Sequence, residues 1–378
     1  MERLRSVDTA SWCSFVHVGT TTKASRSNCM NVPDGIAPTG VDLESDIART
    51  AQRYVELVPT VVLGSGASAE LGLPLMKELG KRLVDSVRPT SKGDRTKWRG
   101  IAARLRGGQD LEAALSTSRP SKALLAQIVR ATWQFVSRRD LRAYEKLVTN
   151  AAESSHARLF KYLLRSANKQ IEVVTTNYDR LAEYGADLAF GTALTGFTSG
   201  WIQRWESQAH ERGERHRVRV VKVHGSLDWF RSASGEIVGM PLQSRIPRTL
   251  SPCVVTPGLD KYREAYEEPF RSAIANADQA LVQARSFFCA GYGFNDEHIQ
   301  PKLIARMRQD AVPIVVIARS LTPRTRQLLL EPAPPPEYML VEKHAKGSIA
   351  YCKLTPEGYV FHKKNYWTLD GFISGFLQ

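Results

Sequence analysis

The apolar residues of the chain alternate between short unbroken runs and longer stretches with helical spacing. The runs are rich in β-branched and aromatic residues and lie at Thr60–Leu63, Ile171–Thr175, Val218–Val223, Val254–Val255, Phe287–Ala290 and Pro313–Ile317. Runs of this kind are typical of strands that are buried on both faces of a parallel sheet. Most are separated by stretches of helical pattern, such as Arg180–Leu188, Lys261–Arg285 and Glu297–Arg308. Strands that alternate with helices predict an α/β fold, a Rossmann-like doubly wound parallel sheet.

A long helical stretch interrupts this alternation. Between about residues 75 and 165, apolar residues repeat at helical spacing and no strand pattern occurs. Such a length is too great for a single crossover connection. We therefore expect a large helical insertion beside the first strand.

The two ends of the chain differ from its central part. Residues 1–50 are rich in Ser, Thr, Asn and Gly and predict a loosely ordered N-terminal extension, although a short helix is expected over Ser45–Leu57. Residues 51–331 form the expected α/β domain. The segment EPAPPPE then breaks the pattern, and residues 332–378 predict a small C-terminal appendage with one hairpin and a last short helix.

Composition narrows the function classes. The chain is 43% hydrophobic and 24% charged, which is an ordinary globular composition. It has no apolar stretch of about 18 residues and no apolar block at its N-terminus, so we expect a cytoplasmic protein without a membrane segment. Its five cysteines form no CxxC pair, which argues against a disulfide framework and against structural zinc. No metal site is therefore expected.

The formal net charge of +14 raises the question of a nucleic-acid partner. Its densest part, Lys81–Arg106, holds nine Lys or Arg residues but a single aromatic residue, Trp98. Proteins that bind single strands place aromatic residues among their basic ones, and that arrangement is missing here. Nucleic-acid binding stays open but is not indicated directly, and contact with an acidic or DNA-bound protein is the favoured interpretation.

The turn after the first strand is the most informative stretch. In the segment PTVVLGSGASAELGLP, glycines follow the strand at once and an amphipathic pattern comes next. Gly64 and Gly66 allow a tight turn and a close approach to a ligand, while Ala69 stands where such turns accept a small residue. Free N–H groups at the start of the next helix favour a phosphate there. The turn, Gly64, Ser65, Gly66, Ala67 and Ser68, is a candidate nucleotide site, although similar turns also occur by chance.

Polar residues follow the other predicted strands where each strand ends. They are Thr176, Asn177 and Asp179 after the second strand, His224 and Gly225 after the third, and Gly291, Tyr292, Asn295 and Asp296 after the strand Phe287–Ala290. Each has an ordinary reading as a helix cap or turn residue. The carboxyl ends of parallel strands meet at one edge of a sheet, however, so we expect these residues to gather around one crevice.

On these residues the chain resembles the sirtuin superfamily, and closely resembles the sirtuin-like NAD hydrolases of bacterial antiviral defence. The motif GxGxSxxxGxP is met by Gly64, Gly66, Ser68, Gly72 and Pro74; the Asn-x-Asp, His-Gly and later glycine-loop motifs are met by the strand-end residues above. The resemblance covers about Pro59–Ser320. Leu75, Met76 and Lys77 replace the Asp-Phe-Arg of sirtuin deacylases, and the four-cysteine zinc ribbon of those enzymes is absent from the sequence.

The resemblance implies that NAD is the substrate and that no zinc is bound. In that family, Asn177 would bind the ribose hydroxyls and position a water, and His224 would accept a proton. Asp179 would orient the nicotinamide side or its own loop. The turn Gly64–Ser68 would hold the diphosphate, and Gly291, Asn295 and Asp296 the adenosine ribose. Thr176, Gly225 and Tyr292 complete the expected NAD-binding set.

The resemblance also implies a biological role. It predicts hydrolysis of NAD to ADP-ribose and nicotinamide in anti-phage defence, with NAD depletion as the outcome of abortive infection. Such an activity needs a gate, so we expect a homo-oligomer or a partner such as a defence ATPase or DNA translocase. The alternatives are an NAD-dependent protein deacylase and a non-catalytic scaffold that senses NAD or ADP-ribose. The presence of both Asn177 and His224 favours an enzyme over the scaffold.

Overall fold

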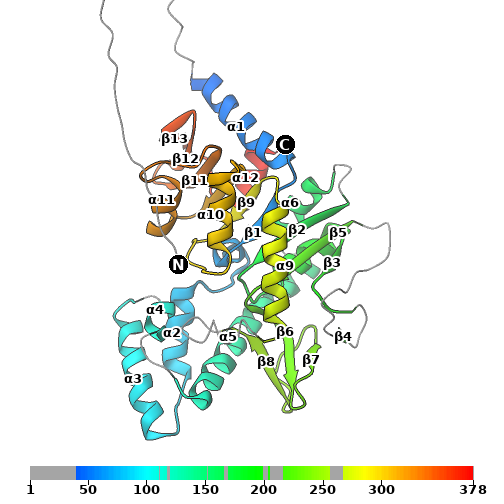
Figure 1. Ribbon diagram of the computed structural model, residues 1–378, viewed down its shortest axis with the longest axis vertical. Coiled ribbons are helices and arrows are strands. Elements are labelled where there is room, and N and C mark those ends of the chain that lie inside the picture. The colour runs from blue at the N-terminus through cyan, green and yellow to red at the C-terminus, as the bar shows by residue number, and fades with distance from the viewer. Residues whose placement is uncertain are drawn as a thin grey trace, which may run out of the picture. The chain divides into compact units, whose positions relative to one another are not determined.

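A nine-stranded sheet organises the described part of the chain, in the strand order β13-β12-β11-β10-β9-β1-β2-β5-β3 (Figure 1). The structure is a computed structural model that describes residues 40–109, 111–116, 120–150, 152–165, 169–198, 203–204, 216–255 and 267–377. Neighbouring strands from β11 to β3 run parallel, and β12 and β13 are antiparallel. The predicted α/β fold with a doubly wound parallel sheet is confirmed, apart from the antiparallel strands β12 and β13 at one edge.

The elements of this layer alternate along the chain. The strands are β1 (Thr60–Leu63), β2 (Gln170–Thr175), β3 (Thr192–Leu194), β5 (Arg217–Lys222), β9 (Phe287–Ala290), β10 (Ile314–Ala318), β11 (Tyr338–His344), β12 (Gly347–Cys352) and β13 (Thr355–His362). The helices that cover the sheet are α1 (Gly40–Glu56), α6 (Ser155–Leu163), α7 (Leu181–Leu188), α9 (Phe270–Gln283), α10 (Gln300–Gln309), α11 (Pro323–Leu329) and α12 (Leu369–Phe376).

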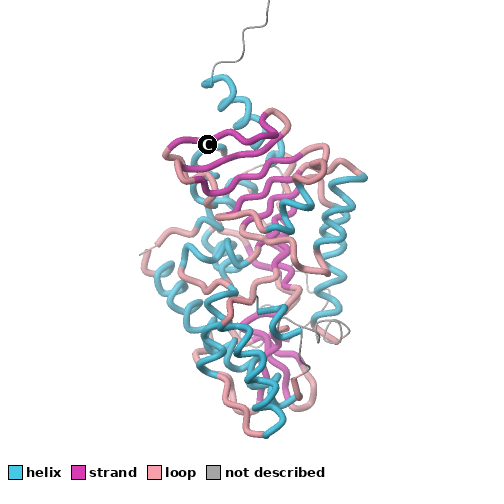
Figure 2. The backbone as a smooth tube through the Cα atoms, turned by 90° about the vertical axis from the view of Figure 1, so that its left-hand side faces the viewer, coloured by secondary structure: helices cyan, strands magenta, loops and turns pink. Residues whose placement is uncertain are grey.

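Both faces of the sheet are buried, because alternate side chains of each strand enter different cores. Val61 and Leu63 of β1 pack with residues of α1, α6, α7 and α12. Val62, between them, packs on the other face with residues of α9, α10 and α11. Figure 2 shows the strands following one another with helices on either side. Burial on both faces explains why these strands read as continuous apolar runs.

The predicted helical insertion is confirmed, but it ends at Val148 rather than near residue 165, because α6 packs against the main sheet. It comprises α2 (Met76–Ser86), α3 (Lys92–Arg106), α4 (Leu111–Ser116) and α5 (Lys122–Val148). These helices share an apolar core of their own, which includes Leu79, Trp98 and Ile128. The Ser91 and Ser121 hydroxyls accept the backbone N–H of Asp94 and Leu124, and so fix the starts of α3 and α5.

A second, antiparallel sheet was not predicted. It contains β4 (Gln203–Arg204), β6 (Gly225–Ser232), β7 (Ile237–Gly239) and β8 (Leu250–Val254) in the order β4-β7-β6-β8. The run Val254–Val255, expected in the parallel sheet, lies at the end of β8 instead. Two apolar residues carry no information on strand direction, so this part of the prediction is wrong.

The two ends of the described chain belong to the same unit as the main sheet, Gly40–Gln378. The predicted hairpin is present as β12 and β13, but β11 pairs in parallel with β10 and joins it to the main sheet. The helix α1 begins at Gly40, so the last part of the expected N-terminal extension is helical. Residues 1–39 and the start of the predicted helix Lys261–Arg285 lie outside the described residues.

Within the described residues, none of the helices combines the length and the apolar character that crossing a bilayer requires.

One histidine lies deep in the sheet core. His156, in the first turn of α6, is 1% exposed, and its Nδ1 atom has no hydrogen-bond partner among the described residues. The ring packs near Phe160, with 6.5 Å between ring centroids. Burial lowers the pKa of His156 to about 4. The ring is therefore neutral in the folded protein at neutral pH.

We expect the protein to lose stability as the pH falls from about 6.5 to about 4. In this window the unfolded chain binds a proton at His156 and the folded chain does not, so the free energy of unfolding falls, by up to about 3 kcal/mol in total. Urea unfolding at about pH 7.5 and about pH 5 measures the difference. His156→Met should remove this part of the pH dependence, and His362→Met, at an exposed position, should keep it. Equal pH dependence in wild type and His156→Met would contradict the prediction.

Candidate active site

Two glycine loops pack against each other at the carboxyl edge of the sheet. The turn after β1 leads into a 3₁₀ helix, η1 (Ser65–Leu71), rather than directly into an α-helix. Gly64 N–H donates to Ala290 O (3.0 Å) and Gly66 N–H to Gly291 O (3.2 Å). A Cβ atom at Gly66 would stand 2.7 Å from the Gly291 Cα atom. The glycines are therefore required by contact between the two loops, in addition to any approach of a ligand.

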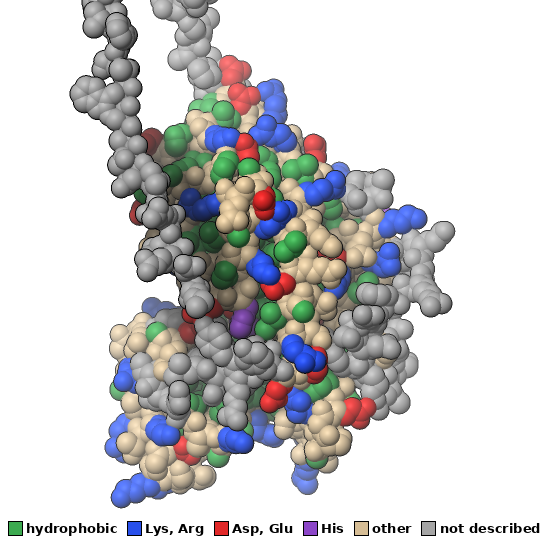
Figure 3. Space-filling model, viewed as in Figure 1, with side chains coloured by type: hydrophobic (Ala, Val, Ile, Leu, Met, Phe, Trp, Pro, Cys, Tyr) green, Lys and Arg blue, Asp and Glu red, His purple; other side chains and the backbone are tan. Residues whose placement is uncertain are grey.

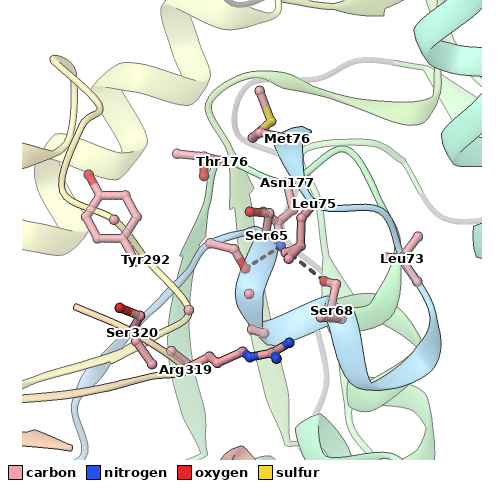
Figure 4. A pocket seen from close by; sticks show the side chains of 18 of the residues that line it. Ser65, Ser68, Leu73, Leu75, Met76, Thr176, Asn177, Tyr292, Arg319 and Ser320 are labelled. Carbon is pink, nitrogen blue, oxygen red and sulfur yellow. Dashed lines mark hydrogen bonds between the residues drawn. The ribbon is translucent and has the colours of Figure 1, made fainter. Parts of the chain in front are cut away.

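A cavity of about 1000 Å³ opens above these loops. That volume is at the upper end of the range for small-molecule sites. Its walls contain every predicted site residue except Gly225: Gly64, Ser65, Gly66, Ala67, Ser68, Thr176, Asn177, Asp179, His224, Gly291, Tyr292, Asn295 and Asp296. On the side of the helical insertion, Leu73, Leu75 and Met76 form an apolar wall (Figure 4). The strand ends thus bring the predicted residues together as expected.

Asn177 is held with its amide nitrogen turned toward the glycine turn. Its Nδ2 atom donates to Gly64 O (2.9 Å) and to Ser68 Oγ (3.1 Å), as Figure 4 shows. Its backbone N–H donates to Thr175 Oγ1 (3.0 Å). With both amide hydrogens engaged, the Oδ1 atom has no donor among the described residues and is the atom left for a ligand or water.

His224 lies where the chain leaves the main sheet and enters the small sheet. The next residue, Gly225, has φ +81°, and a side chain there would strike the backbone of Cys253. Gly225 therefore allows the backbone turn that positions His224, and it does not line the cavity. The His224 Nε2 atom lies 2.9 Å from Asp296 Oδ2. The other oxygen of Asp296 accepts the backbone N–H of His298 (3.0 Å) and of Ile299 (3.1 Å), which fixes the carboxylate at the start of α10.

This position of Asp296 differs from the sequence interpretation. The resemblance assigned Asp296 to the adenosine ribose, but its carboxylate faces His224 in the structure. Its neighbour Asn295 is exposed and lines the cavity. Tyr292 also lines the cavity, but its ring is buried against Phe294. The strand-end motifs predict which residues gather at this edge of the sheet. The direction of each side chain depends on the geometry of its loop.

A buried lysine supports the loop that carries Asn177. Lys222, the last residue of β5, has a fully buried side chain that donates to the Asp179 backbone O and to Glu183 Oε1 (2.9 Å). Burial raises the pKa of Glu183 to about 7, although Lys222 opposes the shift. Burial also raises the pKa of Asp179, again opposed by Lys222. The Asp179 Oδ1 atom accepts the Leu181 N–H (3.2 Å), so this carboxyl group shapes its own loop.

The helical insertion is tied to the same loop by an ion pair. Asp140 of α5 accepts the Arg180 backbone N–H (2.8 Å), the Arg180 Nε (3.0 Å) and the Tyr184 hydroxyl (2.8 Å). The side chains of the pair are 0% and 5% exposed. Nearer the start of α5, Trp133 Nε1 donates to Leu227 O of β6 (2.7 Å). The sequence analysis did not identify this link, because nothing local marks Asp140 as the partner of Arg180.

Sequence reasoning also missed the part of the cavity beyond the second glycine loop. Arg319 and Ser320 follow β10, Lys343 lies at the end of β11, and Trp367 precedes α12; all line the cavity. The strand-end rule applied to Pro313–Ile317 would have found the first two. Nothing in the sequence signals that β11 is a parallel neighbour of β10, so Lys343 and Trp367 could not be predicted as cavity residues.

The fold and the site define a doubly wound α/β domain with a ligand-sized cavity at the carboxyl edge of its sheet. Within that class, residues 171–331 match the family model of the SIR2-like domain. The match runs from β2 to α11 and includes Asn177, His224 and Asp296.

Solved structures similar to this chain have low identity. They include a Sir2 homologue in complex with NAD (16% identity, 78% of this chain and 87% of that chain covered, TM-score 0.42) and a mutant Sir2 homologue in complex with ADP-ribose (17%, 72% and 87%, TM-score 0.41). A structure described as the basis for the mechanism and regulation of Sir2 enzymes has 18% identity, with 74% and 87% covered and a TM-score of 0.38. No protein with curated annotation matches the sequence.

We expect Gly291→Ala to destabilise the protein by about 2 kcal/mol or more and to impair ligand binding. Gly291 has φ +58°, and a Cβ atom there would meet the backbone of the turn after β1. Gly100→Ala is the matched control, because Gly100 is exposed within α3 and, among the described residues, a Cβ atom there would come near Arg104 Nη1 alone, at 4.0 Å. That variant should be more stable by about 0.5–1 kcal/mol. Denaturant unfolding compares the two; similar stability for both variants would contradict the required loop contact.

Proposed function

We propose that this protein is an NAD+ hydrolase that converts NAD+ and water into ADP-ribose and nicotinamide. The observation that carries the proposal is the convergence of Asn177, His224 and Asp296 in one cavity, directly beside the glycine turn. The SIR2-like domain match over these three residues supports it.

The chemistry requires support for a cation on the ribose. Cleavage of the bond between the nicotinamide nitrogen and ribose C1′ moves its electron pair to nicotinamide and develops positive charge on the ribose ring. A water oxygen then bonds to C1′ from the opposite face. In the proposed site, the Asn177 Oδ1 atom accepts a hydrogen bond from this water or from a ribose hydroxyl, because the amide nitrogen is already held by Gly64 and Ser68.

The water must lose a proton, and the imidazole of His224 is the acceptor in this proposal. The Asp296 carboxylate, 2.9 Å from Nε2, would stabilise the positive ring that results. Two backbone N–H groups fix Asp296, so in the proposed mechanism its carboxylate would also orient the imidazole. The diphosphate would lie over the turn Gly64–Ser68. The Gly64 and Gly66 N–H groups are used within the protein, so the side chains and other N–H groups of the turn would bind it.

We expect His224→Ala to lower NAD+ turnover by about 100-fold or more while leaving the fold intact. Nicotinamide and ADP-ribose release, followed by chromatography, measures the activity, and circular dichroism checks the fold. His362→Ala, on the exposed side of β13, is the control and should retain activity. Asn177→Ala should lower kcat; a rise in KM alone would make Asn177 a binding residue. Undiminished turnover of a folded His224→Ala protein would remove His224 from the mechanism.

The same assay separates the proposal from the alternatives. Nicotinamide release that requires an acyl-lysine peptide would establish deacylation instead. Binding of NAD+ or ADP-ribose without any release would establish a scaffold.

We further propose that the activity depletes NAD+ in antiviral defence within the cytoplasm and is gated by assembly. The sequence resemblance supports this role, and an ungated hydrolase would drain its own cell. On the face shown in Figure 3, the Lys and Arg side chains of the described residues that are visible are spread among acidic ones and form no single continuous patch. This distribution is more consistent with contact to a protein than with a nucleic-acid track.

Light scattering of the purified chain should show a homo-oligomer, and NAD+ turnover should rise when a defence ATPase or DNA-bound partner is added. The measurement is nicotinamide release per chain with and without the partner. A monomer with full turnover on its own would contradict the gating proposal and leave the hydrolase proposal intact.

A further inference from the structure

The cavity continues past the glycine loops to the ends of β10 and β11. Arg319 follows β10, and Lys343 and His344 end β11. These strands are parallel neighbours, and the Lys343 N–H donates to Arg319 O (3.3 Å), so their ends lie together. Trp367, from the segment before α12, lines the cavity at the same end.

This end of the cavity carries uncompensated positive charge. The Arg319 side chain extends into the cavity in Figure 4, and its guanidinium forms no ion pair or hydrogen bond with a described residue. The Lys343 ammonium stands 5.7 Å from the Trp367 ring centroid, a contact that leaves its charge in place. The adjacent Glu342 is buried and accepts from the Leu321 N–H (2.9 Å) and from Arg326.

The acidic residues that line the cavity belong to other parts of it. They are Glu70 of η1, Glu112 of α4, Asp179 after β2 and Asp296 after β9. Asp296 follows the strand next to β10, but its carboxylate faces His224. The cationic end therefore lies apart from the carboxylates of the cavity. An anionic ligand group requires this separation, because carboxylates would repel it.

The order of strands fixes which part of a dinucleotide reaches this end. Neighbouring strands are about 4.8 Å apart, and β10 and β11 lie two and three strands beyond β1, or about 10 and 14 Å. With the scissile bond at Asn177 and the diphosphate over the turn after β1, the adenosine lies toward β10 and β11. This placement rests on the proposed function.

We propose that the ends of β10 and β11 bind a phosphate on the adenosine ribose, so that 2′-phosphorylated dinucleotides of the NADP+ class bind better than NAD+. The planar guanidinium of Arg319 matches a phosphate with two parallel hydrogen bonds. Lys343 adds a second charge at the same edge. An arginine near the adenosine ribose is a general means of accommodating a 2′-phosphate in doubly wound folds.

Calorimetry with 2′,5′-ADP and 5′-AMP tests the inference without any reaction. The wild-type chain should bind 2′,5′-ADP about 10-fold or more tightly than 5′-AMP, since one charge-assisted contact is worth about 1.4 kcal/mol or more. Arg319→Ala should remove most of this preference and change 5′-AMP affinity by less than about 3-fold. Lys346→Ala removes an equal charge from the exposed turn after β11 without touching the cavity, and should keep the preference.

Two results would overturn the inference. Equal affinity of the wild type for both ligands would show that no additional phosphate is bound. An equal loss for both ligands in Arg319→Ala would show that Arg319 acts on the shared 5′-phosphate. Comparison of kcat/KM for NADP+ and NAD+ then tests turnover. If the 2′,5′-ADP preference holds and neither dinucleotide is cleaved, the proposed hydrolase fails while the phosphate site stands.

Discussion

The close contact between the turn after β1 and the turn after β9 is the constraint on which the rest of the site depends. Each loop occupies space that a side chain on the other would need, at Gly64, Gly66 and Gly291. Because β1 and β9 are neighbouring parallel strands, their following loops leave the sheet at the same edge and meet within a few residues of the strand ends. The carbonyl of Gly64 also accepts the amide of Asn177, so the same turn sets the direction of that side chain.

Buried charged residues hold the loop that carries Asn177 in place. Lys222 bonds to its backbone at Asp179, and Asp140 bonds to its continuation at Arg180. Buried ion pairs add little net stability over apolar packing, but the loss of one partner leaves a buried charge and is costly. Such pairs instead restrict the geometry of the loop. The cost of burial is visible in Glu183, whose pKa rises to about 7 even beside Lys222.

The parts of the fold that the sequence predicts are those with local signals. The runs Thr60–Leu63 and Phe287–Ala290 coincide with β1 and β9, because each is short, apolar and followed at once by glycine. The direction and partner of a strand depend on distant residues, so the placement of β8 was wrong and the parallel pairing of β11 was not found. For the site, the strand-end rule found the gathering of residues. It could not find that Asp296 faces His224, since that depends on how the loop enters α10.

The last part of the chain forms one wall of the cavity, so the cavity is completed late during synthesis. Lys343 and Trp367 to Leu369 line the cavity, whereas the glycine turn that begins it lies some three hundred residues earlier in the sequence. A nascent chain that has exposed β1, β2, β5 and β9 still lacks this wall, and domains are completed only as their later segments leave the ribosome. The finished cavity therefore forms only after residue 369 has been made. Premature termination anywhere before that point yields a protein with an incomplete ligand site, even where most of the sheet is present.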